Sequence, residues 1–226
     1  GPALPYGTDT YQAEGLIRAG VTLANARGAR ALMYPTLSVG NNVNFKAFPF
    51  ACRIGVETLM HTLVDIFTAL REDGIRKIVV VMGHGGNTDA IRAAFRAYVD
   101  RTRDGERAFV CAYSSPPAAE LEKHPSEHGG ERETSNIMHL HPELVREEKL
   151  ANFPLGQLAV AALERPGIYF VKPWHLYVPA SAGGETREAS AEKGRQFLER
   201  NSRHLADFLV SLSQAPWTPT FPFAGK

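Results

Sequence analysis

The sequence predicts an α/β fold in which helices cover both faces of a mainly parallel sheet. Between residues 56 and 114, helix-like and strand-like patterns alternate, which is the order that right-handed βαβ units require. The chain has 226 residues, of which 44% are hydrophobic. A chain of that size can bury roughly 70% of its extended surface in one core. We therefore expect a single domain over residues 1–226.

Five segments carry helix signals. Apolar residues recur in them at intervals of three and four positions, Asp9 or Thr8 can cap the first, and Gly74 follows the second as a stop. The expected helices span residues 8–27, 56–73, 88–103 and 187–213, and a further helix begins near Glu131.

Four short apolar runs are expected to be strands. The run at 78–82 is continuous and largely β-branched, as in strands that are buried on both faces. The other three expected strands are 31–35, 108–114 and 168–171. Between the first two strands, residues 36–51 are rich in Asn and Gly and form a longer connection than usual, which is typical of functional loops.

Charge and cysteine content exclude several classes of protein. The 25 Lys and Arg residues against 24 Asp and Glu give a net charge of +1, without the basic cluster that nucleic acid or an anionic membrane requires. Cys52 and Cys111 are too few and too far apart for a disulfide framework. No apolar run approaches the ~18 residues of a membrane helix. We expect a cytoplasmic protein whose partners are neither nucleic acid nor membrane.

The first chemical motif is Gly-His-Gly-Gly-Asn at residues 83–87, directly after the expected strand 78–82. Ligands bind at this end of strands in open α/β sheets, and the glycines leave His84 free to ligate a metal from the turn. Two other interpretations stay open. The turn could hold a phosphate, although it lacks the glycine spacing and the lysine of known phosphate loops, or it could be a tight turn with a surface histidine.

The second motif covers residues 127–135 and reads Glu-His-Gly-Gly-Glu-Arg-Glu-Thr-Ser. Glu131 and Glu133 fall in the first turn of an expected helix, where carboxylates are stabilised, so simple capping explains both. Glu127 beside His128 is different, because a carboxylate and an imidazole on a glycine-flanked loop supply a general base and a group that stabilises charge.

The third motif is Pro-Ala-Leu-Pro-Tyr-Gly-Thr-Asp at residues 2–9. An aspartate at a helix start is most often a cap, and Asp9 has that alternative too. Taken together, the three motifs bring Asp, His and Glu to chain reversals that a parallel sheet can gather at one edge. These are ligands that suit Zn²⁺ or Mn²⁺.

In order and spacing, the three motifs resemble the creatininase family of metal-dependent amidohydrolases. The family pattern is Glu-x-His-Gly-Pro-x-Leu-Pro-x-x-x-Asp, then Asn-Gly-His-x-x-Asn, then Glu-His-Gly-Gly followed by Glu-Thr-Ser. The resemblance implies a three-layer αβα sandwich that forms a homo-oligomer, a hexamer or a dimer-based assembly. It also implies two divalent ions, Zn²⁺ with Zn²⁺, Mn²⁺ or Fe²⁺ at the second site, which activate water to cleave a C–N bond of a small cyclic amide or formamide-like substrate.

The resemblance also assigns roles to individual residues. Asp9 matches a carboxylate that bridges both ions, and His84 matches a ligand of one ion. Glu127 matches the carboxylate that transfers protons, and His128 matches a residue that stabilises the developing negative charge. Creatinine hydrolases carry an acidic ligand at the position of Gly86, so Glu133 is expected to substitute for it.

Three departures from the family pattern limit the expectation. The first Glu and His of the pattern would precede Gly1, so the domain is expected to lack its N-terminal strand and part of its metal-ligand segment. Residues 124–125 and 48–51 differ from those that surround creatinine, which makes creatinine an unexpected substrate. The alternatives are a non-catalytic subunit with an assembly or regulatory role, and a phosphate-binding or nucleotide-binding module built on the 83–87 turn.

Overall fold

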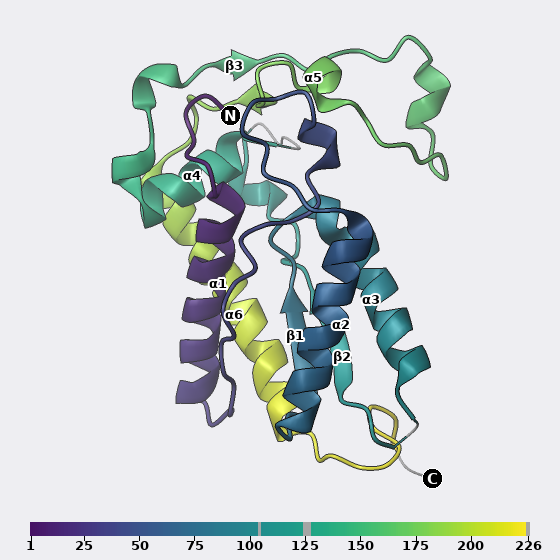
Figure 1. Ribbon diagram of the computed structural model, residues 1–226. Coiled ribbons are helices and arrows are strands. Elements are labelled where there is room, and N and C mark those ends of the chain that lie inside the picture. Colours follow the sequence, from purple (N-terminus) through teal and green to yellow (C-terminus); the bar gives the residue numbers. More distant parts are fainter. Residues whose placement is uncertain (104, 124–127, 225–226) are drawn as a thin grey trace. The chain divides into compact units, whose positions relative to one another are not determined.

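The computed structural model describes residues 1–103, 105–123 and 128–224, and the chain divides into two compact units (Figure 1). The first unit comprises Gly1–Gln12, Asn42–Cys52 and Pro117–Leu198, and the second comprises Ala13–Asn41, Arg53–Pro116 and Glu199–Lys226. The single domain expected over residues 1–226 stays a prediction.

The helices confirm the predicted segments 8–27, 56–73 and 88–103 to within two residues at each end, and they confirm the predicted start near Glu131. They are α1 (Thr8–Ala26), α2 (Val56–Glu72), α3 (Thr88–Arg101), α4 (Glu131–Leu140), the short α5 (Trp174–Tyr177) and α6 (Ala191–Gln214). The strands are β1 (Lys77–Val81), β2 (Phe109–Tyr113), β3 (Asn152–Phe153) and β4 (Gly184–Glu185). The helix predicted to begin at residue 187 begins at Ala191, because the preceding residues form a turn in which Ala189 N–H donates to Thr186.

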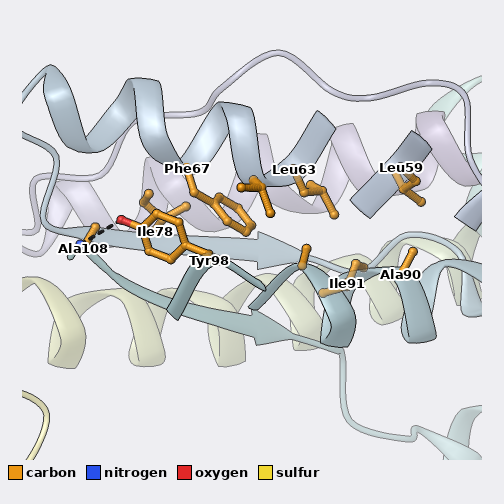
Figure 2. Close-up of a cluster of buried hydrophobic side chains, with 10 residues drawn as sticks. Leu59, Leu63, Phe67, Ile78, Ala90, Ile91, Tyr98 and Ala108 are labelled. Atoms are coloured by element: carbon orange, nitrogen blue, oxygen red, sulfur yellow. Dashed lines mark hydrogen bonds between the residues drawn. The ribbon is translucent and has the colours of Figure 1, made fainter. Parts of the chain in front are cut away.

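In the second unit, β1 and β2 pair in parallel, with Lys77 opposite Phe109 and Val81 opposite Tyr113. Side chains alternate between the two faces of this sheet. Ile78 packs with α2 and α3 on one face, whereas Tyr113 contacts Phe208 of α6 on the other. Helices therefore cover both faces of the parallel pair, which confirms the α/β fold class and gives this unit its three layers (Figure 2).

The core of the second unit lies between α2, α3 and β1 (Figure 2). Phe67 and Tyr98 point toward one another there, and their rings meet edge to face at 5.6 Å. The hydroxyl of Tyr98 is buried, and it accepts a hydrogen bond of 3.0 Å from the backbone N–H of Ala108. This bond satisfies the one polar atom that the ring brings into the core.

Lys77 links the start of β1 to the C-terminal end of α6 by hydrogen bonds. Its Nζ donates to the carbonyl oxygen of Leu212 at 2.6 Å and to that of Ala215. Carbonyl groups at the end of a helix have no partner within the helix, and a positive charge there is favourable.

We expect Lys77→Met, which keeps the length of the side chain but removes its charge, to lower the free energy of unfolding by about 1.5–3 kcal/mol, the range for hydrogen bonds to charged groups. Urea denaturation followed by circular dichroism measures the loss. Lys149→Met, at an exposed lysine of the first unit, is the control. Equal stability of the two variants would contradict the role given to Lys77.

Two predicted strands are wrong. Residues 31–35 and 168–171 form no strand, because their apolar side chains face outward rather than into a core: Leu32 is 88% exposed and Tyr169 is 78% exposed. The side chain of Asn25 takes the place of a strand partner for Ala31, since it bonds both the N–H and the C=O of that residue.

The first unit holds the antiparallel pair β3 and β4, two residues each, with Asn152 opposite Glu185 and Phe153 opposite Gly184. Strands this short leave no periodic pattern in a sequence, which is why they were not predicted. None of the helices in the described part of the chain combines the length and the apolar character that crossing a bilayer requires.

Candidate active site

The N-terminal end of α4 positions Glu133. Gly130 lies just before the helix in an extended conformation, and Gly129 has a φ of +60°, which a residue with a side chain rarely adopts. This turn brings the N–H of Gly129 to 2.6 Å from Oε2 of Glu133. Glu133 therefore binds the backbone one residue before the N-cap Gly130, and its second oxygen is not engaged by that bond.

His128 precedes this turn and lies beside Glu133. Its Nδ1 is 4.0 Å from Oε2 of Glu133, and the side chain of each residue is 19% exposed. The carbonyl oxygen of His128 accepts a hydrogen bond of 2.8 Å from Gly183 N–H. An imidazole and a carboxylate thus lie together in a largely buried place.

Asp9, in the first turn of α1, is the third group of this cluster. Burial raises the pKa of Glu133, and the negative charge of Asp9 raises it further, against the lowering effect of the Gly129 N–H and of Arg132. A bound cation would relieve the repulsion between these two neighbouring carboxylates, so the cluster favours cation binding.

This donor set fits a divalent ion in part. Carboxylate oxygens suit Zn²⁺ and Mn²⁺, and the mutual repulsion of Asp9 and Glu133 would be relieved by a bound ion. Over residues 1–103, 105–123 and 128–224, however, no three side chains of His, Cys, Asp or Glu converge as a complete metal site. Asp9 and Glu133 are the residues of the first unit that would hold an ion.

His84 belongs to the second unit, where it follows β1 as predicted. Its Nε2 lies 3.3 Å from the carbonyl oxygen of Asn41. The side chain of Asn87 accepts the N–H of Asn41 at 2.8 Å, so the 83–87 turn is braced against residues 40–41. A Cβ on Gly86 would come within 2.5 Å of both Asn41 O and His84 Nε2, so only glycine fits there. The predicted proton-transfer residue Glu127 lies outside the described residues.

Two features of the first unit were not predicted from the sequence. Glu131 is fully buried and forms an ion pair with Lys193 of α6. The ring of His128 is in contact with the rings of Phe45 and Trp174. No spacing signal could have found either, because the partners lie 46 to 83 residues apart in the chain and meet only in the folded unit.

Known proteins similar to this chain point to one family. The sequence model of the creatininase family, described as creatinine amidohydrolase, matches residues 1–209. The chain belongs to the creatininase family. Family membership agrees with the order of the three motifs and with the α/β fold.

Individual family members similar to this chain have different names. A mycofactocin precursor peptide peptidase from Mycobacterium ulcerans is 29% identical over 97% of this chain and 81% of the relative. A creatinine amidohydrolase from Pseudomonas putida is 27% identical over 78% of this chain and 73% of the relative. The crystal structure of a putative creatinine amidohydrolase from Bacteroides fragilis is 27% identical and covers 96% of this chain and 86% of that one, with a TM-score of 0.84.

Other solved creatininases share the fold at lower identity. One, described as a manganese form, is 24% identical with a TM-score of 0.73, and another, described as a Zn–Zn form, is 23% identical with a TM-score of 0.72. Both descriptions concern those proteins.

Proposed function

We propose that this creatininase-family chain is a metal-dependent hydrolase that cleaves an amide C–N bond. The observation that carries the proposal is the cluster of Asp9, Glu133 and His128 in the first unit, where burial and the charge of Asp9 raise the pKa of Glu133. Two carboxylates and an imidazole gathered in a largely buried place are costly for stability alone, which supports a functional reason for the arrangement.

Each of these residues has a role that its position supports. Asp9 and Glu133 would hold the ions, and His84 stays a predicted ligand on the strength of the family motif. The second oxygen of Glu133 is the one that would face an ion, because Gly129 N–H binds the first. His128 donates toward the carbonyl oxygen of the substrate as negative charge develops there. Glu127 is proposed to take a proton from water and to deliver it to the leaving nitrogen.

The ions themselves are proposed to be two per chain, Zn²⁺ with Zn²⁺, Mn²⁺ or Fe²⁺ at the second site. Bound ions would lower the pKa of water and polarise the amide carbonyl. The manganese and zinc forms of similar creatininases support this choice of metals. A homo-oligomer, either a hexamer or a dimer-based assembly, and a cytoplasmic location stay predictions.

The substrate has two candidates. The family motifs favour a small cyclic amide or formamide-like compound other than creatinine. A peptide is the second candidate, because relatives with 29–31% identity are named peptide peptidases. A non-catalytic subunit with an assembly or regulatory role is the alternative to both.

The test is hydrolysis by the protein expressed from its complete gene and loaded with Zn²⁺ or Mn²⁺. The panel contains hydantoin and N-formylglycine for the first candidate, tetra-alanine for the second and creatinine as the substrate not expected to react. Hydrolysis of any panel compound supports a hydrolase; mass spectrometry reads it as the addition of one water to a cyclic compound or as two fragments of a linear one. Absence of both turnover and bound metal would support the non-catalytic subunit instead.

Replacing the predicted site residues one at a time separates their roles. We expect Glu133→Gln and His84→Ala to lose bound metal, because each removes a predicted ligand. Glu127→Gln is expected to keep its metal but lose turnover, because that carboxylate is proposed to move protons. Elemental analysis beside the hydrolysis assay checks both expectations. Full metal content in Glu133→Gln, or activity within about tenfold of wild type in Glu127→Gln, would contradict the assignment.

A further inference from the structure

The aromatic rings of His128, Phe45 and Trp174 in the first unit contact one another. Phe45 lies at the end of a short helical turn, Val43–Phe45, and Trp174 begins α5. The ring centroids of His128 and Phe45 are 4.8 Å apart, those of His128 and Trp174 are 4.7 Å apart, and those of Phe45 and Trp174 are also 4.7 Å apart. Each ring therefore touches the other two.

The ring planes are tilted by 58° to 65° to one another, close to the edge-to-face arrangement that aromatic pairs prefer. Such a closed triangle leaves the imidazole little room to rotate about its side-chain bonds. Phe48 supports the triangle from outside, with its ring 5.8 Å from that of Phe45.

The backbone on either side of the imidazole is fixed as well. The carbonyl of His128 accepts from Gly183, and the next N–H, that of Gly129, donates to Glu133. The backbone bonds do not set the direction of the His128 side chain. The rings of Phe45 and Trp174 set it. In that direction, Nδ1 lies 4.0 Å from Oε2 of Glu133.

We propose that Phe45 and Trp174 are positioning residues, whose rings hold the imidazole of His128 in the orientation in which it faces Glu133. The inference rests on the proposed function, in which His128 stabilises charge on the substrate. Neither ring needs to touch the substrate. A group that must donate a hydrogen bond to a developing oxyanion loses its effect when it is displaced by about 1 Å, at a cost of up to roughly 100-fold in rate.

The test compares variants that remove a ring with variants that keep one. Trp174→Leu and Phe45→Leu remove the ring, whereas Trp174→Phe and Phe45→Tyr keep it. Trp217→Leu is the matched control, because it replaces the second of the two tryptophans, which lies in the other unit and contacts Phe221. All variants are made in the metal-loaded protein expressed from its complete gene.

The first readout is independent of activity. In protein labelled with ¹³C-histidine, the ring signals of His128 are identified among those of the other histidines by their loss in His128→Gln. We expect these signals to move in Trp174→Leu and in Phe45→Leu, because the neighbouring ring current disappears, and to stay in place in Trp217→Leu. Unchanged signals in Trp174→Leu would overturn the proposal.

The second readout is kinetic and uses the panel compound that wild type hydrolyses fastest. Loss of either ring is expected to lower kcat by about 10- to 100-fold with KM within about twofold, and Trp174→Phe is expected to restore most of kcat. A rise in KM with unchanged kcat would overturn the proposal, since the rings would then bind substrate. If His128→Gln is inactive but Trp174→Leu is normal, the positioning role alone fails. If His128→Gln keeps its kcat, the role of His128 in the proposed function fails first.

Discussion

Lys193→Met is expected to lower the free energy of unfolding by about 3–5 kcal/mol, the range measured when one partner of a buried ion pair is removed. Glu131 has no exposed surface, and Lys193 Nζ donates to its Oε1. The other oxygen of Glu131 accepts the backbone N–H of Lys123 at 2.9 Å. Without Lys193, the buried carboxylate of Glu131 loses this counter-charge.

Chemical denaturation of the metal-free protein measures this effect without any assumption about activity. Lys123→Met is the matched control, because Lys123 pairs through its ammonium group with Glu188 at the surface and its side chain is 62% exposed. That pair should contribute less than about 1 kcal/mol. Combining Lys193→Met with Glu131→Gln should recover part of the loss, since no charge is then left buried. A double variant less stable than Lys193→Met would contradict the explanation.

Gly194→Ala is expected to lower the free energy of unfolding by about 2 kcal/mol. Alanine favours a helix over glycine by about 1 kcal/mol, so intrinsic propensity alone predicts a gain. Packing opposes it, because a Cβ on Gly194 would lie 2.0 Å from the carbonyl oxygen of Ser135 in α4. Overpacking costs about 1–3 kcal/mol, and the upper end applies here since a backbone atom cannot turn aside.

Gly20→Ala in α1 is the control for this prediction. It brings the same gain in propensity, but the nearest atoms to its Cβ are Cδ2 and Cγ of the Leu205 side chain, at 2.7 and 2.9 Å. A side chain can change its rotamer, so we expect a loss smaller than that of Gly194→Ala. Thermal and urea unfolding of both variants decide the order. A Gly194→Ala protein as stable as wild type would mean that α4 and α6 are not in this contact.

Local patterns explain the parts of the fold that the sequence predicted well. The helical spacing of apolar residues and the following Gly74 predict the helix at 56–72. The continuous β-branched run predicts β1. The apolar run at 31–35 has the same local composition as a strand. It forms no strand because it has no neighbouring strand to pair with. No local pattern predicts that the side chain of Asn25 forms hydrogen bonds with the backbone of Ala31 instead.

The same distinction applies to the candidate site. The motifs supplied the candidate residues, and they predicted that Glu133 falls in the first turn of a helix that begins near Glu131. That Glu133 lies near Asp9, 124 positions away, and that its pKa is raised there, is a property of the folded unit. Phe45 and Trp174 belong to no motif and to no periodic pattern, so only tertiary structure connects them to His128.

Gly86 has a consequence for how such a site can change during evolution. A single substitution there to glutamate, the kind of ligand that creatinine hydrolases are expected to carry at this position, would bring its Cβ within 2.5 Å of the backbone oxygen of Asn41. An acidic residue at position 86 therefore requires the 40–41 backbone to move first. If Glu133 is the acidic ligand as proposed, a single mutation at position 86 could not take over its role, because the backbone at 40–41 would have to change as well.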